Sequence, residues 1–285
     1  MKLVRFGPRG EERPGVLMEK DSKILDVRAM AFDIEDFNGH FFTHWGIQRI
    51  QALLKEPSLK TVPADGVRLG PPVARPGKIV CLGKNYADHA AEFDAEIPSS
   101  PILFSKAPTS LVGPFDPIVL PRGANIVDGE VELAVVIGKT ACRVSESDAL
   151  QFIAGYTVLN DVTDREAQKE GKQWFRAKSA DTFCPLGPYL VTPDEIRDPQ
   201  NLRLCSKVNG STLQDNNTAN MIFKIAHLIS FISATMTLEP GDLMSTGTPG
   251  GIGSAHKPAV VFRPGDIVET AIEGVGAQRA RVERT

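Results

Sequence analysis

The sequence predicts an α+β protein that is rich in strands and contains few helices. Short apolar and β-branched segments recur along the chain, and turns separate them, in keeping with its 25 glycines and 21 prolines. Helical spacing of apolar residues occurs at only a few places. Because strands and helices do not alternate regularly, the sequence favours a mixed, β-rich arrangement over a doubly wound parallel sheet.

The amino-terminal part is predicted to contain a hairpin and a helix. Residues 2–6 and 14–18 are strand-like segments on either side of the turn-like GPRGEER. Apolar residues then repeat at helical spacing over 47–54. The following segment, 68–78, has three prolines and a composition typical of a linker.

A chain of 285 residues is long enough for one large core and a small appendage. With the linker as boundary, we expect a small domain over 1–70 and a larger one over 71–285.

The larger domain begins with a predicted buried strand at 78–83 and a short alanine-rich helix at 85–93. The segments PILF and FDPIVLP predict further strands that prolines interrupt. The clearest strand is 131–138, which is continuous and β-branched. A capping-box pattern at 145–148 predicts a short helix, which leads into a strand at 155–162.

The carboxyl-terminal part is predicted to hold one long helix and further strands. Apolar residues over 221–232 follow helical spacing and predict an amphipathic helix. Pro-Gly-Asp turns at 240–242 and 264–266 each precede a strand, and the strand 267–275 is expected to close the chain.

Composition narrows the class of protein. The net charge is -3 and the pI is about 6.0, so no overall positive charge favours binding to nucleic acid or to an anionic membrane. The four cysteines form no C-x-x-C pair, which argues against a zinc ribbon or a redox dithiol. The chain begins without a signal-peptide pattern and has no apolar run that could span a bilayer. We therefore expect a cytoplasmic protein.

Acidic residues at two strand ends are the first candidates for a site. Glu130 and Glu132 lie two apart at the start of an apolar strand, so their side chains share a face. A hard divalent cation would relieve their repulsion, because it prefers oxygen ligands. Asp161 closes another apolar strand, a common position for site residues. From these segments alone, solvated surface acids and a turn or cap aspartate are the simpler interpretation.

The next candidates allow a catalytic or a plain structural interpretation. His89 and Glu92 have the i, i+3 spacing of neighbours on a helix, and a carboxylate beside an imidazole can form a general base. The alternative is an ordinary surface pair. Lys178, judged from its local sequence, is predicted to be a surface lysine.

Two other patterns are weaker. The glycine-rich STGTPGGIG, residues 245–253, can present backbone N–H groups to an anion or simply form a tight turn. His40 and His44 have a spacing that can bind metal, but the aromatic residues beside them favour packing.

Seven segments occurring in order over residues 78–276 resemble the fumarylacetoacetate hydrolase family. They are GKNYADHAAE, PILFSK, DGEVELAVVIG, GYTVLNDVTDREAQ, AKSADTFCPLGP, VNGSTLQDNNTANMI and PGDLMSTGTPGGIG. Each is weak alone, but their order is specific. The resemblance implies a mixed β-sandwich roll as the catalytic domain, a small amino-terminal α/β appendage, and a homodimer.

The resemblance also implies a Mg²⁺ or Mn²⁺ ion, with Glu130, Glu132 and Asp161 as its ligands. In many members the segment around the metal aspartate reads NDVSAR. Here Thr163 keeps the hydroxyl, whereas Asp164 adds a negative charge close to the expected pocket.

The remaining site residues are likewise implied by the resemblance. The catalytic group comprises His89, Glu92 and Lys178, and the substrate-binding group comprises Arg165, Gln168 and Thr248. The implied reaction is metal-dependent hydrolysis of a C–C bond in a small 2,4-dioxo acid (acylpyruvate-like) through an enolate. Oxaloacetate decarboxylation and keto–enol isomerisation are the alternatives, and a homologue that binds metal or ligand without turnover is a remote one.

Overall fold

A computed structural model describes residues 1–92 and 96–285 of the chain. Position 93 of the helix expected at 85–93 therefore lies outside the described residues. The strands are β1 (Lys2–Phe6), β2 (Arg13–Met18), β3 (Lys23–Asp26), β4 (Thr61–Pro63), β5 (Leu69–Gly70), β6 (Ile79–Gly83), β7 (Ile102–Lys106), β8 (Leu111–Val112), β9 (Ile118–Leu120), β10 (Val127–Asp128), β11 (Val131–Ile137), β12 (Ile153–Asn160), β13 (Thr163–Asp164), β14 (Cys184–Val191), β15 (Arg203–Val208), β16 (Ser211–Asn217), β17 (Leu243–Ser245), β18 (Ile267–Ile272) and β19 (Gly276–Arg284).

The helices are short. The α-helices are α1 (Val27–Met30), α2 (Gly39–Thr43), α3 (Gly46–Leu53), α4 (Ala87–Ala91), α5 (Arg165–Glu170), α6 (Phe175–Lys178) and α7 (Ile225–Ser233). Single turns of 3₁₀-helix occur at Pro108–Ser110, Ala149–Phe152, Pro193–Glu195, Thr218–Asn220 and Gly253–Ala255. None of the described helices combines the length and the apolar character that crossing a membrane requires.

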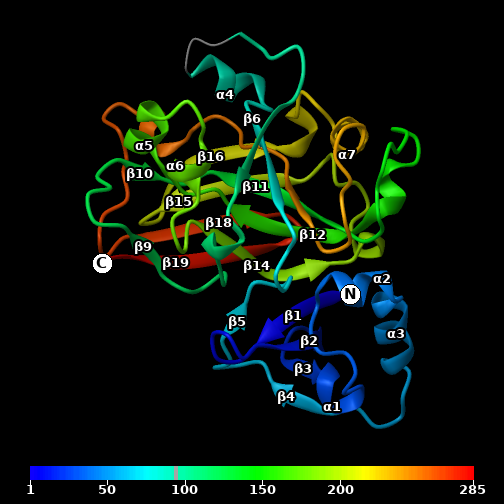
Figure 1. Ribbon diagram of the computed structural model, residues 1–285. Helices are drawn as coiled ribbons and strands as arrows, with labels where there is room; N and C mark the ends of the chain where they lie inside the picture. The colour runs from blue at the N-terminus through cyan, green and yellow to red at the C-terminus, as the bar shows by residue number, and fades with distance from the viewer. Residues whose placement is uncertain (93–95) are drawn as a thin grey trace.

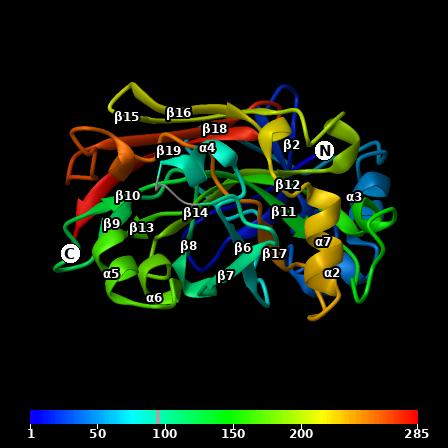
Figure 2. The same ribbon diagram turned by 90° about the horizontal axis from the view of Figure 1, so that it is seen from above.

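Two large sheets make up most of the described chain, and Figure 2 shows them from above. A 12-stranded sheet follows the order β4-β3-β2-β1-β14-β12-β11-β17-β6-β7, with β5 and β8 paired beside β1 and β14. A 5-stranded sheet follows the order β16-β15-β18-β19-β9. Strands β10 and β13 form a short ribbon close to the site described below. Because most pairs are antiparallel and helices are few, the predicted β-rich α+β fold is confirmed.

The amino-terminal strands extend the larger sheet. Strand β1 pairs with β2 on one side and with β14 on the other. Figure 1 shows β1 to β4 and α1 to α3, in blue, below the larger body. The backbone ladder therefore runs from these strands into β14. The division into domains at residue 70 stays a prediction.

Strand β11 shows why the larger sheet is stable. It is buried along its whole length, and its side chains alternate between two apolar clusters. Leu133 and Val135 face the second sheet and helix α7. Ala134 and Val136 face the cluster that includes the helices of the amino-terminal part. Because both faces are covered, the sequence from Leu133 to Ile137 is continuously apolar rather than alternating.

The structure corrects three of the predicted elements. Helix α7 begins at Ile225, so the helix predicted from residue 221 is too long at its start. Met221 instead forms a β-bridge with Tyr86. The segment after the capping-box pattern is a 3₁₀-helix, and the Ser145 hydroxyl bonds to the side chain of Asp148 rather than to the backbone. A further strand, β19, follows the one expected to close the chain.

Candidate metal and catalytic site

Three carboxylates from two neighbouring strands meet at one end of the larger sheet. Strands β11 and β12 are antiparallel, with Val131 opposite Asn160. This register sets Glu130 opposite Asp161, whose N–H donates to the Glu130 carbonyl at 2.9 Å. Glu132 lies two residues further along β11 and therefore on the same face as Glu130. One oxygen from each carboxylate lies within 4.8 Å of the other two.

Burial and neighbouring charges act differently on these acids. Glu130, Glu132 and Asp161 are 4%, 1% and 0% exposed, so the simpler interpretation of surface acids is wrong. Burial raises the pKa of Glu132, and the adjacent carboxylates of Asp161 and Glu130 raise it further. Burial would also raise the pKa of Glu130, but Lys178 and Arg165 outweigh it and hold that pKa below its ordinary value.

Lys178, at the end of α6, bridges two of these acids. Its ammonium donates to Asp161 Oδ2 at 2.5 Å, Thr163 Oγ1 at 2.8 Å and Glu130 Oε2 at 3.1 Å. Burial lowers its pKa, but the charges of Asp161 and Glu130 more than offset this and keep the group protonated. Lys178 is buried, so its local interpretation as a surface lysine is wrong.

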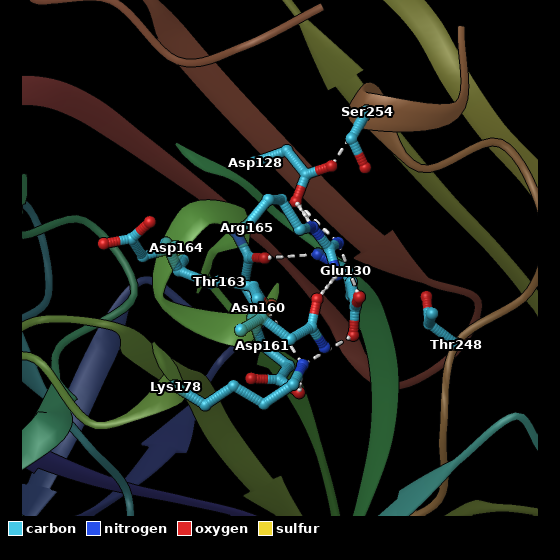
Figure 3. A network of polar contacts seen from close by, with 12 residues as sticks. Asp128, Glu130, Asn160, Asp161, Thr163, Asp164, Arg165, Lys178, Thr248 and Ser254 are labelled. Carbon is cyan, nitrogen blue, oxygen red and sulfur yellow. Dashed lines mark hydrogen bonds and ion pairs between the residues drawn. The ribbon is translucent and has the colours of Figure 1, made fainter. Parts of the chain in front are cut away.

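Arg165 opens helix α5 and is held by a second group of contacts, shown in Figure 3. Its Nε donates to Asp128 Oδ1 at 2.7 Å, and one Nη donates to Glu130 Oε1 at 2.6 Å. The other Nη donates to Gln168 Oε1 at 3.1 Å. Asp128 also accepts a hydrogen bond from the Ser254 N–H at 2.7 Å. No role for Asp128 was predicted from the sequence, where its place two residues before Glu130 was the only signal.

Lys106 is a further cation that the sequence interpretation missed. It is the last residue of β7, and its side chain is fully buried. Its ammonium donates to Asp161 Oδ1 at 2.6 Å and to the Val162 carbonyl at 3.3 Å. A lysine that closes the apolar segment PILFSK was the available signal, because a buried lysine needs an acidic partner.

His89 and Glu92 come together on α4 and the residue that ends it. His89 Nδ1 and Glu92 Oε2 are 3.0 Å apart, as the i, i+3 spacing predicted. The other Glu92 oxygen accepts the Gly251 N–H at 2.5 Å. His89 is 7% exposed, so this is not an ordinary surface pair. Glu92 can therefore orient the imidazole while the main chain holds Glu92.

The glycine-rich loop after β17 directs backbone donors at the protein's own carboxylates. The Gly247 N–H donates to Glu132 Oε2 at 3.0 Å, and the Ser245 hydroxyl donates to the same oxygen. The Gly251 N–H donates to Glu92. The expectation that this loop presents N–H groups to an anion is thus met by acidic side chains within the chain.

A cavity of about 270 Å³ lies between these groups. It is lined by Leu82, Gly83, Lys84, His89, Phe104, Glu130, Glu132, Arg165, Gln168, Lys169, Trp174, Lys178 and Thr248. The Thr248 hydroxyl donates to the Val131 carbonyl at 2.9 Å and accepts from Gln214 Nε2 at 2.8 Å. The cavity is therefore lined by every residue to which the resemblance assigns a catalytic or substrate-binding role, except Glu92. Glu92 is connected to the cavity through its bond to His89.

Two other sequence features lie outside this cavity. The Asp164 carboxylate accepts hydrogen bonds from the N–H groups of Glu166 and Ala167 and caps α5, so its charge does not face the cavity. The rings of His40 and His44 pack together with centroids 4.1 Å apart. The carboxylate triad of Glu130, Glu132 and Asp161 has ligand atoms close enough together to hold one metal ion. Over residues 1–92 and 96–285, no other group of three or more His, Cys, Asp or Glu residues does.

The donor set of this triad fits a hard divalent cation. Carboxylate oxygens are the ligands that Mg²⁺ and Mn²⁺ prefer. The raised pKa of Glu132 reflects carboxylates crowded together in a buried place, a repulsion that a 2+ charge would relieve. Glu130, Glu132 and Asp161 are the residues that could hold such an ion.

Comparison with known proteins gives a family match over most of the chain. The sequence model for the carboxyl-terminal part of fumarylacetoacetate (FAA) hydrolase matches residues 78–283. The chain is 46% identical over 286 aligned positions to 2,4-didehydro-3-deoxy-L-rhamnonate hydrolase of Sphingomonas sp. (strain SKA58). The alignment covers 99% of this chain and 96% of that protein.

Two solved structures are similar along nearly the full length of both chains. One is maleylpyruvate hydrolase from Sphingobium sp. SYK-6 in complex with manganese(II) and pyruvate, with a TM-score of 0.82, 32% identity and coverage of 100% and 99%. The other is 5-carboxymethyl-2-hydroxymuconate delta-isomerase from Mycobacterium smegmatis, with a TM-score of 0.79, 34% identity and the same coverage.

Proposed function

Because the chain belongs to the fumarylacetoacetate hydrolase family, we propose that it hydrolyses a C–C bond in a small 2,4-dioxo acid with the help of Mg²⁺ or Mn²⁺. The observation that carries this proposal is the convergence of Glu130, Glu132 and Asp161 beside a cavity that also holds Lys178 and His89. These groups can bind a metal, stabilise an enolate and activate water at one place.

The relatives favour a substrate of the acylpyruvate type. The substrate named for the Sphingomonas relative has oxo groups at carbons 2 and 4 and no hydroxyl at carbon 3. The manganese complex of maleylpyruvate hydrolase holds pyruvate. Hydrolysis of any 2,4-dioxo acid between carbons 3 and 4 releases pyruvate or a related 2-oxo acid together with a carboxylic acid. The volume of about 270 Å³ suits a compact substrate of this kind.

The ion would supply Lewis acidity toward the carboxylate and 2-oxo group of the substrate. Around it, Arg165, Gln168 and Thr248 line the cavity and are the proposed substrate contacts. Arg165 keeps its guanidinium fixed against Asp128 and Glu130, so it offers a rigid edge rather than a mobile side chain. Side chains held in fixed positions lower the activation barrier, because they orient the bound substrate before it reacts.

His89 is the proposed general base. With Nδ1 held by Glu92, its Nε2 can remove a proton from water, and the water oxygen then bonds to carbon 4 of the substrate. The bond between carbons 3 and 4 breaks, and its electron pair moves to the oxygen on carbon 2. Lys178 would exchange its bond to Asp161 for one to that enolate oxygen, and the proton that His89 took from water, delivered to carbon 3, completes the 2-oxo acid.

Isomerisation is the second candidate, because a similar structure is named as an isomerase. Keto–enol isomerisation uses the same enolate but only moves a proton, so it needs no attacking water. Oxaloacetate decarboxylation would also pass through this enolate. The residues of the cavity suit hydrolysis, isomerisation and decarboxylation alike. Which reaction occurs then depends on the bound acid, namely on whether a C–C bond to an acyl group, a C–H bond or a C–C bond to a carboxylate can break.

The test is turnover of a substrate panel after removal and return of metal. The protein is treated with a chelator, then assayed with Mg²⁺ or Mn²⁺ on acylpyruvates with short plain, hydroxylated and carboxylated acyl groups, and on oxaloacetate. We expect metal-dependent release of pyruvate from at least one acylpyruvate. Glu132→Ala and Asp161→Ala should lose metal binding and turnover together.

Two results would reject the hydrolase. One is the absence of metal-restored turnover on every acylpyruvate, which would favour a binding protein. The other is metal-dependent loss or shift of the enol absorbance without release of two products, which would favour the isomerase.

A further inference from the structure

The metal aspartate is held from two sides by lysines on different elements. Lys106, on β7, donates to Asp161 Oδ1 at 2.6 Å, and Lys178, on α6, donates to Asp161 Oδ2 at 2.5 Å. Both lysines are buried, at 1% and 2% exposure. Each oxygen of this carboxylate therefore has its own charged donor, and charge-assisted bonds of this kind fix a carboxylate firmly.

The two lysines have different access to a substrate. Lys178 lines the cavity, whereas Lys106 is not among its lining residues. Lys106 also donates to the Val162 carbonyl, which belongs to the main chain just after Asp161. We therefore expect Lys106 to affect the reaction through its bonds to Asp161 and to the main chain that follows it, and not by touching the substrate.

Strand β7 is also fastened to the helix that carries Lys178. The Ala107 N–H donates to the Ser179 hydroxyl at 2.9 Å, and the Lys178 ammonium lies 4.9 Å from the centre of the Phe104 ring. These contacts connect the residues next to each lysine. The segments that carry the two lysines are therefore held side by side.

The charges around the triad are nearly balanced. Four buried carboxylates belong to Asp128, Glu130, Glu132 and Asp161, and three buried cations belong to Lys106, Arg165 and Lys178. Among the described residues, the acidic partner of Lys106 is Asp161. Its removal would take a positive charge away from a proposed cation site, so simple electrostatics would strengthen the binding of a 2+ ion rather than weaken it.

We propose that Lys106 is a positioning residue that restricts Asp161 to one metal-binding oxygen. Lys178 lines the cavity and is the proposed donor to the enolate, so its bond to Asp161 Oδ2 is the one that an ion and a substrate can replace. Lys106 does not line the cavity and keeps its bond to Oδ1, so Asp161 then offers only Oδ2 to an ion. An octahedral ion that takes one oxygen from each of three carboxylates keeps three positions for other ligands. A 2-oxo acid that chelates through its carboxylate and 2-oxo oxygens needs two of them. This inference rests on the proposed function for the identity of the chelating ligand.

The test separates binding of the ion from binding of the chelating acid. Wild type and Lys106→Met are compared for Mn²⁺ affinity by electron paramagnetic resonance and for oxalate affinity of the Mn²⁺-loaded protein by calorimetry. We expect Mn²⁺ affinity that is unchanged or higher, and oxalate affinity that is lower by about 10- to 100-fold, a range taken from the loss of metal affinity or activity when a group that orients a metal ligand is removed. Turnover, where present, should fall by a similar factor.

Lys78→Met is the matched control. Lys78 lies one residue before β6, the neighbour of β7, and pairs with Asp242 at 2.5 Å outside the cavity. Its loss should leave the affinities for Mn²⁺ and oxalate unchanged. Lys106→Arg keeps a cation beside Asp161 and should recover most of the oxalate affinity.

Two results would overturn the inference. In the first, oxalate affinity of Lys106→Met equals that of wild type. In the second, Mn²⁺ affinity falls and excess Mn²⁺ restores oxalate binding, which would make Lys106 only a support for the metal ligand. If Lys106→Met does not fold, Lys106→Gln is judged by the same two affinities. Neither affinity requires turnover, so a wild type that hydrolyses no acylpyruvate would reject the proposed function without deciding this inference.

Discussion

Glu132 is a carboxylate in a position where its negative charge is costly. It is 1% exposed and shares its surroundings with Glu130 and Asp161. Burial comes first among the causes that raise its pKa, and the two neighbouring acids add to it. Hydrogen bonds from Ser245 and the Gly247 N–H support the ionised form but do not reverse this shift.

The raised pKa of Glu132 predicts how pH affects the chelated protein. The folded state holds the Glu132 proton more tightly than the unfolded chain does, so this contribution to stability is complete below the ordinary glutamate pKa. It is lost as pH rises toward and through the raised value. We expect Tm, measured by calorimetry with chelator present, to fall over that range. Glu132→Gln should fall less steeply, and equal slopes for both proteins would contradict the assignment.

His89 gives a prediction that separates catalysis from metal binding. It bonds to Glu92 and is not one of the three carboxylates that could hold the ion, so His89→Ala should keep its affinity for Mn²⁺. Loss of a general base should lower kcat for C–C hydrolysis by about 10²- to 10⁴-fold. Rapid mixing with an acylpyruvate and titration with Mn²⁺ measure the two effects. An unchanged kcat would assign water activation to another group.

Single residues also show what the sequence could and could not predict about the site. The i, i+3 spacing predicts the contact of His89 with Glu92, and strand register brings Glu130 close to Asp161. Lys106 could not be found in this way, because its partner is 55 residues further along the chain. A buried long-range ion pair leaves no local periodicity.

At the scale of elements, the strands were more predictable than the helices. The continuous apolar segment at 131–138 became β11, whose two faces are both covered. The apolar spacing over 221–232 suggested one helix, but Met221 is used in a β-bridge before α7 begins at Ile225. The same spacing suits a buried extended segment followed by a helix, and only tertiary contacts decide between them.

The loop after β17 gives a prediction about one glycine. Gly251 has φ of +94°, and a Cβ there would lie 2.2 Å from the Leu213 carbonyl oxygen. Gly251→Ala should therefore shift the N–H that holds Glu92, lower turnover and cost about 1–3 kcal/mol of unfolding free energy. Urea unfolding and kcat provide the measurements.

Gly210→Ala is a suitable control for this change. Gly210 also has a positive φ, of +81°, but no atom lies within 4 Å of its added Cβ. It should lose some stability from backbone strain and keep its turnover. If the two variants behave alike, the Gly251 contact with Glu92 has no part in catalysis.

For the whole molecule, the shared sheet predicts cooperative unfolding. Strand β1 pairs with β14, and Leu3 stands opposite Leu190 in a common apolar cluster. The two tryptophans report on the two regions, since Trp45 precedes α3 and Trp174 lines the cavity. In Trp45→Phe and Trp174→Phe, each with one remaining tryptophan, urea should produce fluorescence transitions at the same midpoint. Separate midpoints would mean that the two regions unfold independently.

Leu3 provides a second whole-molecule prediction. It is fully buried between the amino-terminal strands and the larger body. Leu3→Ala should lower the free energy of unfolding by about 2–5 kcal/mol, the usual cost of shortening a buried leucine to alanine. The decrease should be seen by both tryptophans, and Lys23→Ala on the exposed start of β3 should change little.

Glu132 and Glu92 are both held by main-chain N–H groups of the loop that follows β17. Such donors are present whichever side chains the neighbouring positions carry. Substitutions among the side chains that line the cavity can therefore leave the positions of these two acids unchanged, as long as the backbone path through Gly247 and Gly251 is kept.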